Sequence, residues 1–98
     1  MSGGQLDDLY FDQGAGAIFS VSYEGHRIRC YIEQSNAYLA KKASGGIAFP
    51  DVVHRYEALI HSAALAAIKR DGVSADPWGN LVSAQDCESV QGAWKAGR

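Results

Sequence analysis

The clearest pattern in the sequence is an alternation of apolar and polar residues on either side of Glu24 and Gly25, which is typical of two neighbouring β-strands. If these two residues form a tight turn, the large apolar residues that alternate on both sides fall on one face. A three-residue loop would instead place Ser20 against Ile28 and mix the two faces. The pattern therefore predicts a hairpin in which the facing pairs are Tyr23 with His26, Val21 with Ile28, and Phe19 with Cys30.

Two helices are predicted after the hairpin. Residues 35–45 form a short helical pattern, because Ser35 suits the N-cap and Gly45 suits the position after the last turn. A longer helix is expected over residues 49–71, with Gly72 just past its end. Its apolar residues recur at helical spacing and form one inward stripe: Val52, Val53, Tyr56, Leu59, Ile60, Ala63, Ala67 and Ile68.

The ends of the chain have weaker patterns. Short strands are expected at residues 8–12 and 80–84, whereas residues 1–7 and 85–98 show no sustained period and are expected to be flexible. The folded domain would then span residues 8–84. We predict an α+β fold, with a small antiparallel sheet of three to four strands built on the central hairpin and two helices packed on one face.

Composition narrows the class of protein. The 98 residues suffice for one domain, and a composition that is 47% hydrophobic and 20% charged is ordinary for a folded globular chain. The formal net charge of -2 does not favour non-specific binding to nucleic acid. No secretion signal and no membrane span are expected, because no apolar run approaches the length of about 18 residues.

The two cysteines, Cys30 and Cys87, are far apart and belong to no C-x-x-C motif, so neither a zinc site nor a disulfide framework is expected. A reducing cytoplasm is the simplest compartment for such a chain. Cys30 alternates with core residues and is expected to be a buried, inert thiol, whereas Cys87 is expected to be the reactive one.

A set of core and turn positions resembles a known family. These residues are Phe19, Val21, Gly25, Ile28, Cys30, Ile32, Ser35, Leu39, Phe49, Arg55, Ile60, Ala63 and Leu81. Over about residues 9–86 the chain resembles the small bacterial proteins of the domain of unknown function 1488 family. The resemblance implies a compact α+β fold in the bacterial cytoplasm. That family has no established activity, so the resemblance implies no catalytic or binding residue.

His54, Glu57 and His61 stand at helical spacings of three and four, within an arc of about 60 degrees. The two histidine Cα atoms would lie about 10.5 Å apart, so a single metal ion could be shared only if both rings leaned inward. A metal-dependent or histidine-assisted activity is therefore our third hypothesis. The simpler interpretation is that these residues border the apolar stripe and that Glu57 pairs with His61.

The polar face of the hairpin carries Ser20, Ser22, Arg27, Arg29, Tyr31 and Glu33. Arg27 and Arg29 flank Tyr31, and Lys41 and Lys42 of the short helix could extend the same basic patch. Arginine beside an aromatic ring suits a phosphate or a stacked base, so weak binding of nucleic acid or another anion is the alternative hypothesis. An ordinary solvated strand face would have the same composition.

Trp78 lies in a predicted turn and Trp94 in the predicted tail, so at least one indole is expected to be exposed and available as a partner anchor. No catalytic motif of a hydrolase, zinc protease or dinucleotide-binding enzyme is present, and no cofactor is expected. The leading hypothesis is therefore a small bacterial cytoplasmic protein without enzymatic activity, a binding or regulatory module that acts through protein contacts or self-association.

Overall fold

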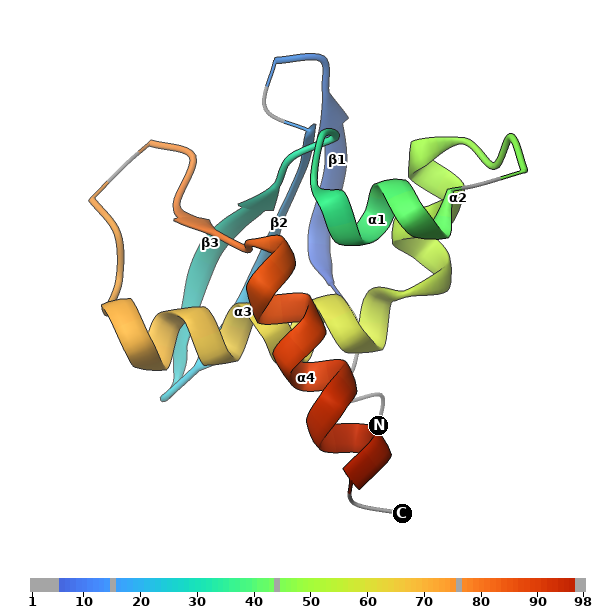
Figure 1. The fold of residues 1–98 in the computed structure, drawn as a ribbon. Coiled ribbons are helices and arrows are strands. Elements are labelled where there is room, and N and C mark those ends of the chain that lie inside the picture. Colours follow the sequence, from blue (N-terminus) through green and yellow to red (C-terminus); the bar gives the residue numbers. More distant parts are fainter. Residues whose placement is uncertain (1–5, 15, 44, 76, 97–98) are drawn as a thin grey trace.

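The computed structural model describes residues 6–14, 16–43, 45–75 and 77–96. Its elements follow one another as β1 (Asp7–Asp12), β2 (Gly16–Tyr23), β3 (His26–Ile32), α1 (Ala37–Lys42), α2 (Phe49–Arg55), α3 (Glu57–Asp71), β4 (Asn80–Leu81) and α4 (Ala84–Ala96) (Figure 1). The strands form one sheet in the order β1-β2-β3-β4. The predicted α+β class is confirmed. The sheet is mixed, because β4 pairs with β3 in parallel, and more helices cover it than the two predicted.

The central hairpin has the predicted register. Tyr23 faces His26, and the pairs continue regularly to Ala17 and Ile32. Glu24 and Gly25 have φ angles of 50° and 81°, as the two central residues of a type I′ turn require. The alternation of apolar residues therefore predicted the length of this turn correctly.

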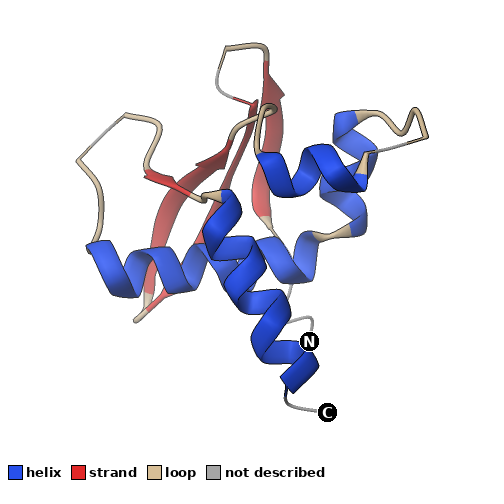
Figure 2. Ribbon diagram, in the orientation of Figure 1, coloured by secondary structure: helices blue, strands red, loops and turns tan. Residues whose placement is uncertain are grey.

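The helices pack on one side of the sheet (Figure 2). The inward residues of the hairpin lie in the core with the apolar stripes of the helices. The largest fully buried residues of this core include Phe19, Val21, Ile32, Leu39, Val52, Val53, Ile60, Ile68 and Val82. The stripe predicted for the long helix is therefore correct as a set of buried positions, with Tyr56 partly buried against the core.

The long helix is interrupted at Tyr56, where φ is -111° and ψ is 26°. The Tyr56 N–H donates to the carbonyl oxygens of both Val52 and Val53, so the chain tightens and turns there before α3 begins. The prediction of one continuous helix over residues 49–71 is wrong at this position. The end was predicted correctly, since Gly72 with a φ of 77° follows Asp71.

The short helix begins one residue later than predicted. Asn36, and not Ser35, is its N-cap, because its Oδ1 accepts the N–H of Tyr38 at 2.9 Å and of Leu39 at 3.2 Å. Asn36 is buried, and its Nδ2 donates to the carbonyl oxygen of Val82 at 3.3 Å. It therefore caps α1 and ties it to the segment after β4, which the exposed Ser35 could not do.

The tail expected to be flexible from residue 85 forms α4. Ser83 and Asp86 cap this helix reciprocally, since the Asp86 N–H donates to Ser83 Oγ at 3.1 Å and the Ser83 N–H donates to Asp86 Oδ2 at 3.1 Å. Arg70 from the last turn of α3 donates to Asp86 as well. At the other end, Leu6 is buried and β1 begins at Asp7, so secondary structure extends beyond residues 8–84 on both sides. Residues 1–5 lie outside the described residues.

Gly79 allows β4 to approach β3. A Cβ atom at this position would collide with the carbonyl oxygen of Arg29, and its φ of 91° is in the left-handed region. Beside it Asn80 is buried, donates to the Gly72 carbonyl oxygen at 2.7 Å and accepts the Ser74 N–H at 3.0 Å. Among the described helices, none combines the length and hydrophobicity needed to cross a bilayer.

Candidate functional site

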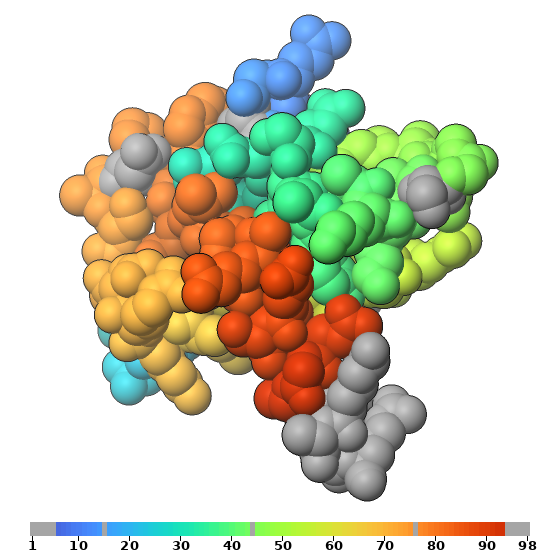
Figure 3. Space-filling model, viewed as in Figure 1, coloured from blue at the N-terminus to red at the C-terminus, as the bar shows by residue number. Residues whose placement is uncertain are grey.

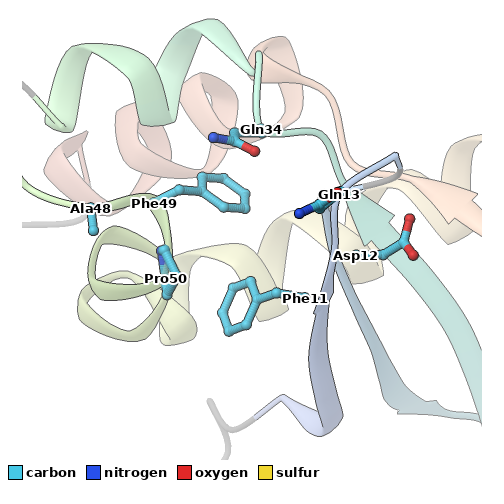
Figure 4. Close-up of a pocket in the computed structure, with 8 residues that line it drawn as sticks. Phe11, Asp12, Gln13, Gln34, Ala48, Phe49 and Pro50 are labelled. Atoms are coloured by element: carbon cyan, nitrogen blue, oxygen red, sulfur yellow. The ribbon is translucent and has the colours of Figure 1, made fainter.

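A pocket of about 390 Å³ opens where the end of β1 faces the start of α2. It is lined by Phe11, Asp12, Gln13, Gly16, Gln34, Ala48, Phe49 and Pro50 (Figure 4). This volume is within the range of about 300–1,000 Å³ that is common for small-ligand pockets. The lining residues come from three segments that are distant in the chain, namely the end of β1 with the turn into β2 and its first residue, the connection from β3 to α1, and the start of α2.

Two phenylalanine rings form the apolar part of the pocket. Phe11 and Phe49 meet edge to face, with ring centroids 6.0 Å apart and planes at 80°. Phe11 remains 39% exposed, so its ring is not sealed in the core. The amides of Gln13 and Gln34 lie near the rings (Figure 4) and can donate and accept hydrogen bonds. The pocket therefore offers an aromatic surface with a few polar groups beside it.

The position of Phe11 follows from an irregularity in β1. The register between β1 and β2 shifts between Asp7 and Tyr10, and Asp8 has a φ of 54°. After this bulge Tyr10 faces Ile18 and Phe11 faces Ala17, so Phe11 points to the helix side of the sheet. There its ring also contacts the His54 ring, with centroids 6.0 Å apart.

The three residues considered for a metal do not assemble as a site. Glu57 Oε2 lies 3.0 Å from His54 Nδ1, and Glu57 Oε1 accepts the Leu6 N–H at 3.2 Å. The predicted pair of Glu57 with His61 is wrong, because the two carboxylate oxygens of Glu57 are instead engaged by His54 and by the Leu6 N–H. Over the described ranges, no group of three or more His, Cys, Asp or Glu residues could hold a metal ion.

The outer face of the sheet carries a row of apolar and aromatic residues in one register. Tyr10, Ile18, Tyr31 and Leu81 face one another successively across all four strands. Tyr10 is 47% and Leu81 is 41% exposed, whereas Ile18 is buried between its neighbours. Ile18 is thus an apolar residue on the face predicted to be polar, and Ser20 on the same face is buried.

The predicted basic patch is divided between two surfaces. Arg27 and Arg29 lie on the outer face as expected, where Arg27 Nη1 donates to Asp8 Oδ2 at 3.0 Å. Lys41 and Lys42 belong to α1, on the helix side of the sheet, so the expectation that they extend this patch is wrong. The Lys42 ammonium instead lies over the rings of Tyr38 and Tyr56, at 5.2 Å and 5.9 Å from their centroids.

The structure changes the expected chemistry of one cysteine. Both Cys30 and Cys87 are free and buried, and desolvation raises the pKa of each thiol to about 12. Asp86 and Glu88 reinforce the effect at Cys87 through their negative charges. Cys87 is therefore inert, contrary to our prediction, because α4 places it in the core. Trp78 is exposed as expected, whereas the side chain of Trp94 lies outside the described residues.

The pocket beside β1 was not predicted from the sequence. Phe11 was assigned to a short strand and Phe49 to a helix start, and the glutamines Gln13 and Gln34 carried no motif. A short exposed strand with two adjacent aromatic residues, Tyr10 and Phe11, was the available signal, since one of two neighbours must face each side of the sheet.

Comparison of the chain with protein-family models, with curated proteins and with solved structures finds no match. The resemblance to the domain of unknown function 1488 family therefore stays a prediction.

Proposed function

We propose that the protein is a binding module without enzymatic activity, which recognises an extended peptide segment of a partner protein along β1. The observation that supports this most directly is the position of the aromatic pocket at an open edge of the sheet. β1 is the first strand in the sheet order, and no described segment pairs with its outer side. A peptide added as a further strand gains main-chain hydrogen bonds, and its alternate side chains point to the helix side.

The pocket would receive one of these side chains. A residue that points inward beside Phe11 would contact the rings of Phe11 and Phe49, and a large apolar or aromatic side chain suits their edge-to-face arrangement. The amides of Gln13 and Gln34 would provide hydrogen bonds to polar groups of the peptide. Affinity would come from the strand pairing and selectivity from this pocket.

The charge of β1 indicates what should flank the apolar residue. The strand has the sequence DDLYFD, with three carboxylates and no basic residue, and the exposed Asp51 follows the pocket residue Pro50. Asp8 is paired with Arg27, whereas Asp7 and Asp51 form no ion pair with a described residue and keep their negative charge available to a ligand. Lysine or arginine on either side of the apolar residue would complement this charge and speed association.

A fluorescein-labelled peptide with one phenylalanine between alternating lysine and valine residues would test the proposal by fluorescence anisotropy. We expect saturable binding that weakens when the phenylalanine is replaced by alanine or the lysines by glutamates. Ala48→Phe fills the pocket from an exposed position and should abolish binding, whereas Ala93→Phe, an equal change on the exposed side of α4, should not. Amide shifts of Asp7–Phe11 in NMR spectra would locate the peptide on β1.

Equal binding by wild type and Ala48→Phe, or peptide-induced shifts confined to other elements, would refute this proposal. Concentration-dependent dimerisation in light scattering, with broadening of the β1 amides, would instead identify a second copy of this chain as the added strand.

The row of Tyr10, Ile18, Tyr31 and Leu81 favours a second candidate function, the binding of single-stranded nucleic acid on the outer face. Tyr10 is exposed and Tyr31 is partly exposed, so their rings could stack on bases. Arg29 makes no ion pair with a described residue and could contact a phosphate. Anisotropy with labelled poly-uridine should show binding at low salt that falls steeply as salt is added and is lost in Tyr31→Ala. Absence of binding at low salt would refute it.

The proposal includes the bacterial cytoplasm as the compartment. The support is that Cys30 and Cys87 are both free thiols.

A further inference from the structure

A second pocket, of about 240 Å³, lies between α1 and α4 and is separate from the pocket beside β1. It is lined by Tyr38, Lys41, Lys42, Glu88 and Gln91. The α1 residues are spaced by three and four positions and the α4 residues by three, so each set lies on one helix face. Figure 3 shows the surfaces of α1 (green) and α4 (red) adjoining on the helix side of the molecule.

The hydroxyl of Tyr38 is an unusual feature of this pocket. Tyr38 is only 3% exposed, and its hydroxyl oxygen is buried. Within the described part of the chain this oxygen has no hydrogen-bond partner. Buried polar groups are nearly always paired, and an unpaired one costs about 1–3 kcal/mol. A buried hydroxyl without a partner, on a residue that lines a pocket, is a candidate donor to a group bound there.

The aromatic ring of Tyr38, which carries this hydroxyl, contacts one neighbouring ring and one ammonium group. The Tyr38 ring packs edge-on against the Tyr56 ring, with centroids 6.2 Å apart and planes at 87°, and the Lys42 ammonium lies 5.2 Å from its centroid. Desolvation, aided by Tyr56, Cys87 and Glu88, raises the pKa of Tyr38 above its usual value. A tyrosine phenol is protonated at neutral pH and can act as a hydrogen-bond donor.

The other lining groups are also donors, with one exception. Lys41 and Lys42 each carry an ammonium, and Gln91 carries an amide. Glu88 offsets one positive charge, so the pocket keeps a formal charge of about +1. A pocket of this size is below the usual range for a whole drug-sized ligand, which favours a single compact group.

We propose that this pocket binds a phosphate group, with the Tyr38 hydroxyl, the Lys41 and Lys42 ammonium groups and the Gln91 amide as donors to its oxygens. A phosphate presents three strong acceptor oxygens, which matches a cluster of donors better than a carboxylate does. The site does not depend on the peptide-binding function proposed for β1.

Titration of 15N-labelled protein with inorganic phosphate and, separately, with glycerol phosphate tests the proposal, with sodium chloride at matched ionic strength as the reference. We expect saturable shifts of α1 and α4 amides with at least one phosphate probe and none with chloride. The tighter of the two probes shows whether free phosphate or a phosphate ester is the better ligand. Equal shifts with sodium acetate would overturn the assignment to phosphate.

Four variants connect the binding to this pocket. Tyr38→Phe should weaken phosphate binding by roughly tenfold, because it removes one hydrogen bond to a charged group. Lys41→Gln should also weaken it, whereas Glu88→Gln should strengthen it by removing the opposing charge. Lys69→Gln, on the exposed end of α3, is the matched control and should have no effect.

Chemical denaturation provides a readout that does not depend on the ligand. Without phosphate, Tyr38→Phe should be at least as stable as wild type, because it deletes an unpaired buried hydroxyl. A less stable Tyr38→Phe would show that the hydroxyl already has a partner within the protein and would overturn the proposal. Unchanged phosphate affinity in both Tyr38→Phe and Lys41→Gln would overturn it as well.

Discussion

At the β4 edge of the sheet three buried polar side chains, Asn36, Asn80 and Asp86, join α1, the segment after α3, and α4 through hydrogen bonds at nearly every polar atom. At the β1 edge aromatic rings meet edge to face, Phe11 among them stays partly exposed, and one hydrogen bond, from the Leu6 N–H to Glu57, joins the start of the strand to α3. Satisfied buried polar groups specify one geometry, whereas ring contacts tolerate displacement. The β4 edge is therefore built for rigidity, and the β1 edge leaves room for a ligand.

Of the substitutions considered, replacement of Asp86 at the β4 edge should cause the largest loss of stability. Asp86→Ala removes the side-chain half of the reciprocal cap of α4 and leaves the part-buried Ser83 N–H without its acceptor, so we expect a loss of about 3 kcal/mol in the free energy of unfolding. The contact with Arg70 adds little, because that guanidinium is half exposed. Urea denaturation followed by circular dichroism measures the change.

Asp71→Asn is the matched control for Asp86, since Asp71 pairs with the same arginine on the surface. Arg70 lowers the pKa of Asp71, but the pair is exposed and its loss should change stability very little. If both variants lose the same stability, the buried cap is not what fastens α4 at this edge.

Alkaline pH should lower the free energy of unfolding through Cys87 of α4, by less than the replacement of Asp86 does. Burial raises the pKa of Cys87 from 9.0 to about 12. Ionisation of this thiol therefore leaves the free energy of unfolding unchanged below pH 9 and lowers it as the pH rises toward 12, because the unfolded chain ionises first. At about pH 10 the expected loss is about 1 kcal/mol for this thiol. Lysines and tyrosines titrate in the same range, so the measurement is the difference between wild type and Cys87→Ala at about pH 8 and at about pH 10.

That difference should shift by about 1 kcal/mol in favour of Cys87→Ala as the pH rises. A constant difference between the two proteins would show that the thiol ionises as easily in the folded chain as in the unfolded one, which its burial argues against.

Replacement of Phe11 should have the smallest effect on stability and the largest on peptide binding. Because the Phe11 ring is 39% exposed, Phe11→Ala should lower the free energy of unfolding by about 1 kcal/mol, well below the cost of truncating a core phenylalanine. Binding of the lysine-flanked peptide should be lost. A stability loss as large as that of Asp86→Ala would show that the β1 edge is as firmly built as the β4 edge.

The hairpin could be predicted in detail because strand alternation has a period of two, so a register error of one residue would expose every inward side chain. The division of the long helix at Tyr56 could not, since the apolar stripe continues on both sides of it and the Tyr56 ring there packs against Tyr38, a residue of another helix. Local periodicity contains no information on such a contact between distant residues.

The helix α4 was predictable in part. Ser83 and Asp86 have the spacing of a capping box, which is a local signal for a helix start, although few apolar residues follow it. The two candidate pockets were not predictable. Each joins residues from elements that only the sheet order and the helix packing bring together, as Phe11 and Phe49 or Lys42 and Gln91 show.

The parallel pairing of β4 with β3 has a consequence for synthesis of the chain on the ribosome. β3 is complete at Ile32, but its second neighbour, Asn80–Leu81, is translated only after α1, α2 and α3. Until then the hairpin has an unpaired edge that another nascent chain could join. A messenger RNA truncated before the codon for Asn80 would therefore yield a product that aggregates. The pairing of β4 is thus the step that covers the exposed edge of β3.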